Sequence, residues 1–88
     1  MADVQLTVEP ATARFYLRID GSPVKLINGK GSKTVAGGRE HALQYFTLGA
    51  PGTKYTVAVA APPEAKGTWG ATFDANGQDA NQVWFWTD

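Results

Sequence analysis

The sequence predicts an all-β fold, an antiparallel β-sandwich of seven or eight short strands. Polar and hydrophobic residues alternate with a period of two along most of the chain, which is typical of half-buried strands. Turn residues separate these segments about every ten residues, and no segment has the spacing of an amphipathic helix. The 88 residues are enough for one domain, residues 1–88. A small closed β-barrel is the alternative, because strand number and alternation do not distinguish the two architectures.

The first half of the chain contains three predicted strands. Residues 4–9 and 14–20 alternate clearly between aliphatic or aromatic and polar side chains. The second segment ends in Asp20-Gly21, a pair that favours a tight turn between two strands. We therefore expect a short return strand over residues 23–28.

A glycine-rich stretch follows over residues 28–38. It contains four glycines in eleven residues, so we expect a long loop, with a two-residue bridge at Thr34-Val35. Glycines and lysines together resemble a phosphate-binding loop, but the required spacing of Gly, four residues and Gly-Lys-Ser/Thr is not met. The stretch is interpreted as a flexible loop with solvated lysines.

The second half contains four further predicted strands. They cover residues 40–48, 54–59, 68–73 and 82–87, and each shows alternation or a high content of aromatic and β-branched residues. The polar segment between the last two carries Asn76-Gly77, which is typical of a hairpin turn.

Composition limits the classes of function. Eight basic and eight acidic residues give a formal net charge of zero, which argues against a nucleic acid partner. There is no cysteine, which excludes disulfides and thiolate chemistry. Leu, Ile, Val and Phe make up only 18 of the 88 residues, so the ten aromatic residues have to supply much of the core.

The chain as given shows no targeting or membrane segment. Its first residues lack the basic and apolar regions of a signal peptide. The longest uncharged, largely apolar stretch, residues 55–63, is far shorter than the roughly 20 residues of a membrane span. We expect a soluble protein with no membrane span, and the compartment is not assigned.

The tryptophans of the last strand are the most informative side chains for function. Trp84 and Trp86 share one face of that strand, and Val83 and Phe85 share the other. We expect the two indoles to point inward, because a core poor in aliphatic residues needs them. If they point outward instead, they form a binding platform. The candidate ligand-binding residues of such a platform are Trp84, Trp86, Trp69, Tyr16 and Tyr45.

Catalytic and metal chemistry is not expected. His41 is the only histidine, and its neighbour Glu40 faces the opposite side of a strand, so we interpret His41 as a polar residue at a strand start. Asp74, Asn76 and Asp79 resemble a weak calcium site, but they do not match the EF-hand template. We expect no enzyme activity, no metal site and no cofactor.

Three segments resemble PEGA-type bacterial surface domains. They are residues 15–21, which end in Asp-Gly, residues 37–43, which carry the histidine at a strand start, and residues 55–59, in which valines alternate. Together with the loop between the first two, they span about half of the chain. The defining Pro-Glu-Gly-Ala run is missing, and the spacing differs by one residue. The resemblance implies a non-enzymatic adhesive or scaffolding module. The predicted sandwich is immunoglobulin-like in shape only, because the Cys-Trp-Cys pattern of immunoglobulin domains is absent.

These observations together predict a non-catalytic binding module. The first expectation is recognition of a protein partner by a rigid sheet face and loops. The first alternative is a carbohydrate-binding module that stacks exposed tryptophans on an uncharged glycan. The second alternative is a structural self-assembly domain, a homo-oligomer in which an unpaired edge strand pairs between chains.

Overall fold

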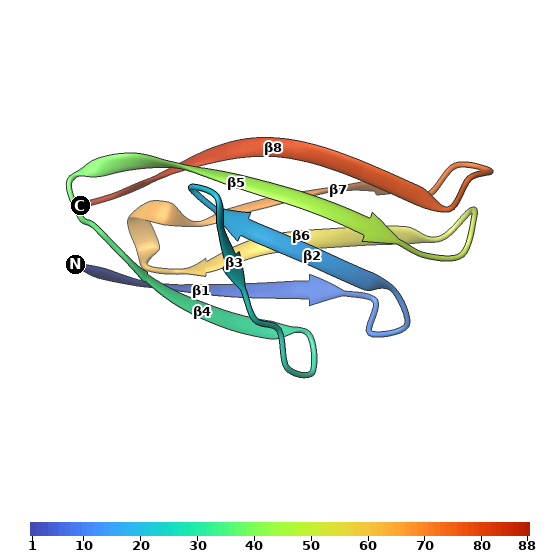
Figure 1. Cartoon of the computed structure of the whole chain (residues 1–88), viewed down its shortest axis with the longest axis horizontal. Helices are drawn as coiled ribbons and strands as arrows, with labels where there is room; N and C mark the ends of the chain where they lie inside the picture. The colour runs from blue at the N-terminus through green and yellow to red at the C-terminus, as the bar shows by residue number, and fades with distance from the viewer.

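The computed structural model describes residues 1–88 as two stacked antiparallel sheets of four strands each (Figure 1). Sheet A has the order β4 (Lys30–Val35), β1 (Ala2–Glu9), β6 (Lys54–Ala61) and β7 (Gly67–Thr72). Sheet B has the order β3 (Ser22–Val24), β2 (Arg14–Ile19), β5 (Arg39–Leu48) and β8 (Gln78–Thr87). A single 3₁₀ turn, η1 (Pro63–Ala65), connects β6 to β7.

This architecture confirms the predicted β-sandwich. No ladder of hydrogen bonds joins β3 to β4 or β7 to β8, so the sheets do not close on each other and the barrel alternative is wrong. The two termini lie at the same end of the sandwich (Figure 1). No helix here has the length and apolar character needed to cross a bilayer.

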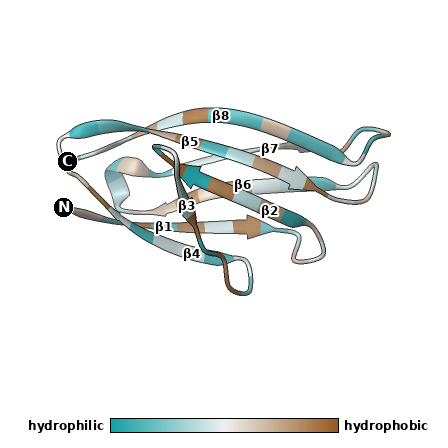
Figure 2. Cartoon of the chain, viewed as in Figure 1, coloured by the Kyte–Doolittle hydropathy of each residue, from teal (hydrophilic) through white to brown (hydrophobic).

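The core lies between the two sheets and follows the alternation of the strands. Brown and teal bands alternate along β1 and β2 in Figure 2, as expected for strands with one buried face. Both sheets contribute aliphatic residues, and the aromatic share comes from two tyrosines and two phenylalanines. The buried hydrophobic residues are Val4, Leu6, Val8, Leu17, Ile19, Val24, Val35, Leu43, Tyr45, Tyr55, Val57, Val59, Ala65, Phe73 and Phe85.

The predicted loop over residues 28–38 is mostly wrong, because its centre is the edge strand β4. Asn28 and Gly29 both have positive φ and form a tight turn, across which Ile27 and Lys30 exchange two main-chain hydrogen bonds. The strand escaped detection because only Val35 is buried among its six residues, so it carries almost no hydrophobic alternation.

The inward orientation predicted for the last two tryptophans is also wrong. Phe85 lies opposite His41 in the β5–β8 ladder, and both side chains are buried. Because side chains alternate along a strand, Trp84 and Trp86 must then point away from sheet A. The volume that we expected the indoles to fill is occupied by Phe85 and by the buried Tyr45 and Tyr55.

Candidate functional site

The outer face of sheet B gathers most of the exposed aromatic side chains. Tyr16 on β2 lies opposite Phe46 on β5, and their ring centroids are 6.2 Å apart. Trp84 and Trp86 follow each other on the same face of β8, and they are 55% and 48% exposed. These four side chains form a surface that we call the aromatic face. It includes four of the six large hydrophobic residues that the chain exposes.

A polar row divides the aromatic face into two parts. Arg18 lies opposite Gln44, and Gln44 lies opposite Gln82, so the three side chains cross the sheet between the two aromatic pairs. The amide of Gln44 donates to that of Gln82 at 3.1 Å. Phe46 lies opposite Ala80, so along β8 the first aromatic pair and Trp84 are four residues apart, which is about 13 Å. The face therefore offers stacking surfaces separated by hydrogen-bonding groups.

The two indoles have small or polar neighbours on the adjacent strand. Trp84 lies opposite Ala42, so no bulky side chain covers it from β5. Trp86 lies opposite Glu40, and its ring Nε1 donates to Asp88 Oδ1 at 2.9 Å. That hydrogen bond holds the ring of Trp86 near the end of the strand and leaves nearly half of its surface exposed.

Two predicted members do not belong to the aromatic face. Tyr45 is buried, because it points inward from β5, and its ring makes an edge-to-face contact with Tyr55 at 6.0 Å. Trp69 lies on β7 in the other sheet, where it is half-buried and packs against the core. Tyr16, Trp84 and Trp86 are the candidates that the structure brings to one face.

Phe46 is the residue of this face that sequence reasoning missed. The hydrophobic Leu43 and polar Gln44 fix which residues of β5 point inward, so the even-numbered residues of β5 point outward. Phe46 shares that parity, whereas Tyr45 shares the parity of Leu43. The alternation of β5 predicts the outward orientation of Phe46, but the adjacent aromatic residues Tyr45 and Phe46 made the alternation hard to recognise.

The predicted weak calcium site is built differently. Asp74 Oδ1 accepts a hydrogen bond from the main-chain N–H of Asn76 at 2.9 Å, and Asp79 Oδ2 accepts one from the Tyr55 hydroxyl at 2.5 Å. Burial, together with the hydrogen bond to Asp79, raises the pKa of the Tyr55 phenol above its usual value. No cluster of three His, Asp or Glu side chains is arranged to hold a metal ion.

A polar cluster centred on the buried His41 and Thr87 joins β5 to the end of β8 and to the exposed Asp20 in the β2–β3 turn. His41 Nδ1 lies 2.6 Å from Asp20 Oδ2, and His41 Nε2 lies 3.0 Å from Thr87 Oγ1 and 2.8 Å from the carbonyl oxygen of Ala36. Glu40 points to the opposite side and is exposed, as predicted from the alternation of the strand.

Thr87, His41 and Asp20 follow one another as the hydroxyl, imidazole and carboxylate of a Ser-His-Asp triad do. They differ from a triad in the hydrogen that His41 Nε2 carries. The Ala36 carbonyl can only accept a hydrogen bond, so His41 Nε2 carries a hydrogen. The Thr87 hydroxyl also donates to this carbonyl, at 2.9 Å. Nε2 therefore cannot take a proton from Thr87, as a catalytic base must. His41 and Thr87 are moreover almost completely buried, which gives a substrate no access.

The second ring nitrogen of His41, Nδ1, favours the ionised form of the Asp20 carboxyl. The hydrogen bond to His41 is the main reason that the pKa of the Asp20 carboxyl lies below its ordinary value. The main-chain N–H of Ala42, which donates to Asp20 Oδ1 at 2.9 Å, lowers it further, while partial burial acts in the opposite direction. Through His41, the cluster links β5 to the β2–β3 turn and to the end of β8.

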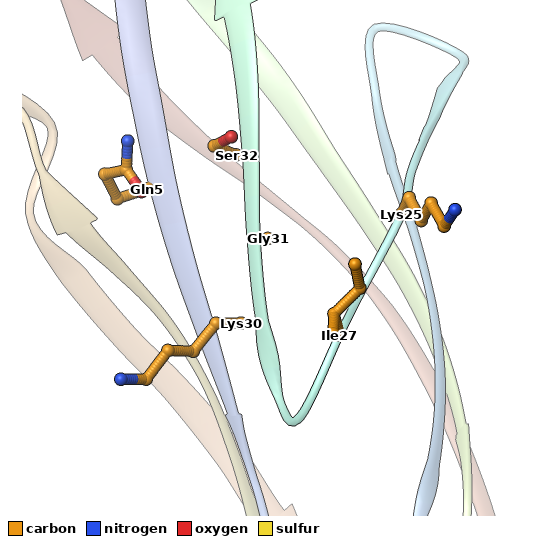
Figure 3. A pocket seen from close by; sticks show the side chains of 6 residues that line it. All are labelled: Gln5, Lys25, Ile27, Lys30, Gly31 and Ser32. Atoms are coloured by element: carbon orange, nitrogen blue, oxygen red, sulfur yellow. The ribbon is translucent and has the colours of Figure 1, made fainter.

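An open hollow lies on the other side of the molecule, where β1 and β4 meet the chain after β3. Figure 3 shows the amines of Lys25 and Lys30 pointing away from each other, and the only hydrophobic side chain in the lining is that of Ile27. The lysines do not converge on a common point, so this glycine-rich segment is not organised as an anion site.

Comparisons with known proteins give no relative from which a function can be transferred. No family model matches the chain, and neither the curated proteins nor the solved structures contain a match.

Proposed function

We propose that this domain is a non-catalytic binding module that recognises a protein partner through the aromatic face of sheet B. The observation that carries the proposal is the outward orientation of Tyr16, Phe46, Trp84 and Trp86 on one face. Trp, Tyr and Arg are the residues most enriched among the energetically dominant positions of protein interfaces. Arg18 lies between the two aromatic pairs and completes this set.

The shape and charge of the face favour a protein over other ligands. Small molecules are usually bound in concave pockets, whereas the depression beside Tyr16 and Phe46 is shallow and open. The formal net charge of zero provides no attraction for a polyanion. An adhesive or scaffolding role, which the resemblance to PEGA-type domains implies, belongs to the same class of function.

The proposal is tested by quantitative capture with matched variants. The immobilised domain is exposed to an extract of cells that produce it, and the captured proteins are compared with those bound by W84S/W86S and by T68A/T72A. The second pair alters exposed positions on β7 of the other sheet. We expect the specific partner to be lost on the order of tenfold with the tryptophan variant and retained with the threonine variant. Equal capture by all three proteins would contradict the proposal.

A second candidate is recognition of an uncharged glycan, which the exposure of Trp84 and Trp86 favours specifically. Flat aromatic rings stack on the apolar faces of sugar rings, and the Gln44–Gln82 pair supplies hydrogen-bonding groups beside them. Tryptophan fluorescence across a panel of soluble oligosaccharides distinguishes the candidates. A saturable response to one sugar class favours the glycan, and no response leaves the protein partner.

A further inference from the structure

The sandwich has four edge strands, and three of them are protected against pairing with another chain. The edge strand β3 has only three residues and contains Pro23. The edge strand β4 carries Lys30 and Lys33, and β7 is short and contains two glycines. Shortness, proline, lysine and glycine all discourage the addition of a further strand.

The fourth edge strand, β8, has none of these protections. It pairs with β5 over ten residues without a bulge, and it contains no lysine, proline or glycine. Its second half, residues 82–87, is uncharged and rich in aromatic side chains. Such a segment on a sheet edge favours pairing with another strand.

The hydrogen bonds show which main-chain groups of β8 point away from β5. Gly49, just after β5, and Gly77, just before β8, continue the β5–β8 ladder by one pair, in which Gly49 N–H donates to Gly77 O at 2.8 Å. The odd-numbered residues of β8 therefore bond to β5. The even-numbered residues of β8 therefore direct their N–H and C=O groups to the open edge.

Some of the N–H groups on the open edge are occupied by side chains. The N–H of Ala80 donates to Asp79 Oδ1 at 2.9 Å, and that of Gln82 donates to Asn81 Oδ1 at 2.8 Å. Beyond the strand, the N–H of Asp88 donates to Glu64 Oε2 at 3.2 Å. Between these capped positions only Trp84 and Trp86 have edge-facing N–H groups without a hydrogen bond. Between Gln82 and Asp88, the open part of the edge therefore coincides with the two exposed indoles.

We propose that β8 pairs antiparallel with β8 of a second copy of this chain, about a two-fold axis at Phe85. Trp84 then lies opposite the partner's Trp86, and Trp86 lies opposite the partner's Trp84. Both are hydrogen-bonded pairs, so together they form four main-chain hydrogen bonds. This inference rests on the proposed function and deepens it by naming the partner.

Symmetry and charge favour a second copy as the occupant. The two open residues are two positions apart, so rotation about Phe85 places each of them opposite the other with no register shift. Residues 80–87 contain no charged side chain, so self-pairing brings no like charges together. Because the other edges are protected, the assembly stops at two chains and forms one continuous eight-stranded sheet.

The pairing extends the aromatic face. Four indoles line up across the two-fold axis as aromatic cross-strand pairs, which stabilise antiparallel ladders. The Tyr16–Phe46 pair of each chain stays exposed further from the axis, because it lies on β2 and β5 and β8 separates it from the edge. The dimer would therefore still have an aromatic surface for a further partner.

The register is tested with complementary single variants followed by sedimentation. In W84K alone or W86E alone, both indole pairs of the dimer are broken. In an equimolar mixture of the two, the introduced lysine lies opposite the introduced glutamate, and one indole pair is retained. A mixture of W84K with W86K has the same geometry but places two lysines opposite each other. We expect the first mixture to dimerise on the order of tenfold more tightly than the second. We also expect the difference to shrink at high salt.

Wild-type protein provides the second measurement and separates this inference from the proposed function. Sedimentation equilibrium is expected to show a monomer–dimer equilibrium and no larger species. A monomer at the highest concentration, or equal dimerisation by both mixtures, overturns the pairing. If the pairing fails while capture of another protein still depends on Trp84 and Trp86, the proposed function stands. If neither is observed, both are wrong.

Discussion

His41 illustrates how this small domain buries an ionisable side chain. Both ring nitrogens have a partner, Asp20 on one side and the Ala36 carbonyl with Thr87 on the other, and no buried side-chain polar atom lacks a hydrogen bond. Buried polar groups destabilise a fold only when they are left unpaired. The cluster therefore adds polar contacts between β5, the end of β8 and the β2–β3 turn.

The substitution H41Q is expected to lower the free energy of unfolding by about 2–3 kcal/mol, because it removes the buried ring that bonds Asp20 on one side and Thr87 and the Ala36 carbonyl on the other. T87V is expected to cost only about 1 kcal/mol, because the histidine still serves the carbonyl. T72V, at an exposed position, is the control and should have almost no effect. Urea unfolding measures all three, and equal stability of H41Q and wild type would contradict a structural role for His41.

Asp20 gives the domain a specific dependence on acid. Its pKa is lowered in the folded state, so its ionised form contributes stability above the ordinary carboxyl pKa of about 3.9, and this is lost as the pH falls through the folded value. We expect D20N, which tolerates the same positive φ, to lose less stability than wild type between about pH 4 and pH 2. Urea unfolding at several pH values measures this, and identical profiles would show that Asp20 has no such role.

At the level of elements, two turns of the same kind organise the first half of the chain. Asp20-Gly21 joins β2 to β3, and Asn28-Gly29 leads into β4, with positive φ at all four residues. The second turn also approaches β1, because Gly29 O accepts a hydrogen bond from Val8 N–H at 2.8 Å. This hydrogen bond extends the β1–β4 ladder of sheet A to the turn at which the chain arrives from β3 of sheet B.

The two glycines form a matched pair for testing this connection. A Cβ at Gly29 would lie 2.9 Å from the carbonyl oxygen of Val8, whereas a Cβ at Gly21 would meet nothing within 4 Å. We expect G21A to cost about 1 kcal/mol for the backbone conformation alone, and G29A about 2–3 kcal/mol. Thermal or urea unfolding of both variants decides the matter. Equal losses of unfolding free energy in G21A and G29A would show that β1 can move away from the new Cβ without destabilising the fold.

The strand β8 carries a buried aromatic side chain between two exposed ones. Phe85 is 6% exposed, so F85A is expected to lower the free energy of unfolding by about 3–4 kcal/mol. W84S and W86S are expected to cost less than about 1 kcal/mol each, because these side chains are about half exposed. The measurements are made at low protein concentration, where association does not contribute. A large loss for either tryptophan variant would contradict the outward orientation.

Strands with one hydrophobic face were predictable, and edge strands without one were not. The alternation in β1, β2 and β6 and the Asp20-Gly21 turn follow directly from the sequence. The polar strand β4 was not predictable from alternation, because Val35 is its only buried residue, although Asn28-Gly29 is a strong hairpin signal. The candidate site depended on which face of β8 is buried, and the pairing of Phe85 with His41 decides this.

For the whole molecule, the small size of the domain explains both its core and its surface. An 88-residue chain leaves much of its apolar surface exposed, so the placement of the large aromatic side chains determines what it can bind. Tyrosines and phenylalanines fill the space between the sheets, and the hydroxyls of the buried Tyr45 and Tyr55 are hydrogen-bonded to Asn81 and Asp79. Trp84 and Trp86 are therefore free for an external surface on sheet B.

The central claim is that β8 presents both of its indoles to solvent on a surface available for binding. Iodide quenching of tryptophan emission in the W69F variant, at low protein concentration, tests it most directly, because only Trp84 and Trp86 then emit. We predict red-shifted emission that iodide quenches efficiently. Blue-shifted emission that is protected from iodide would place the indoles in the core and contradict the binding surface.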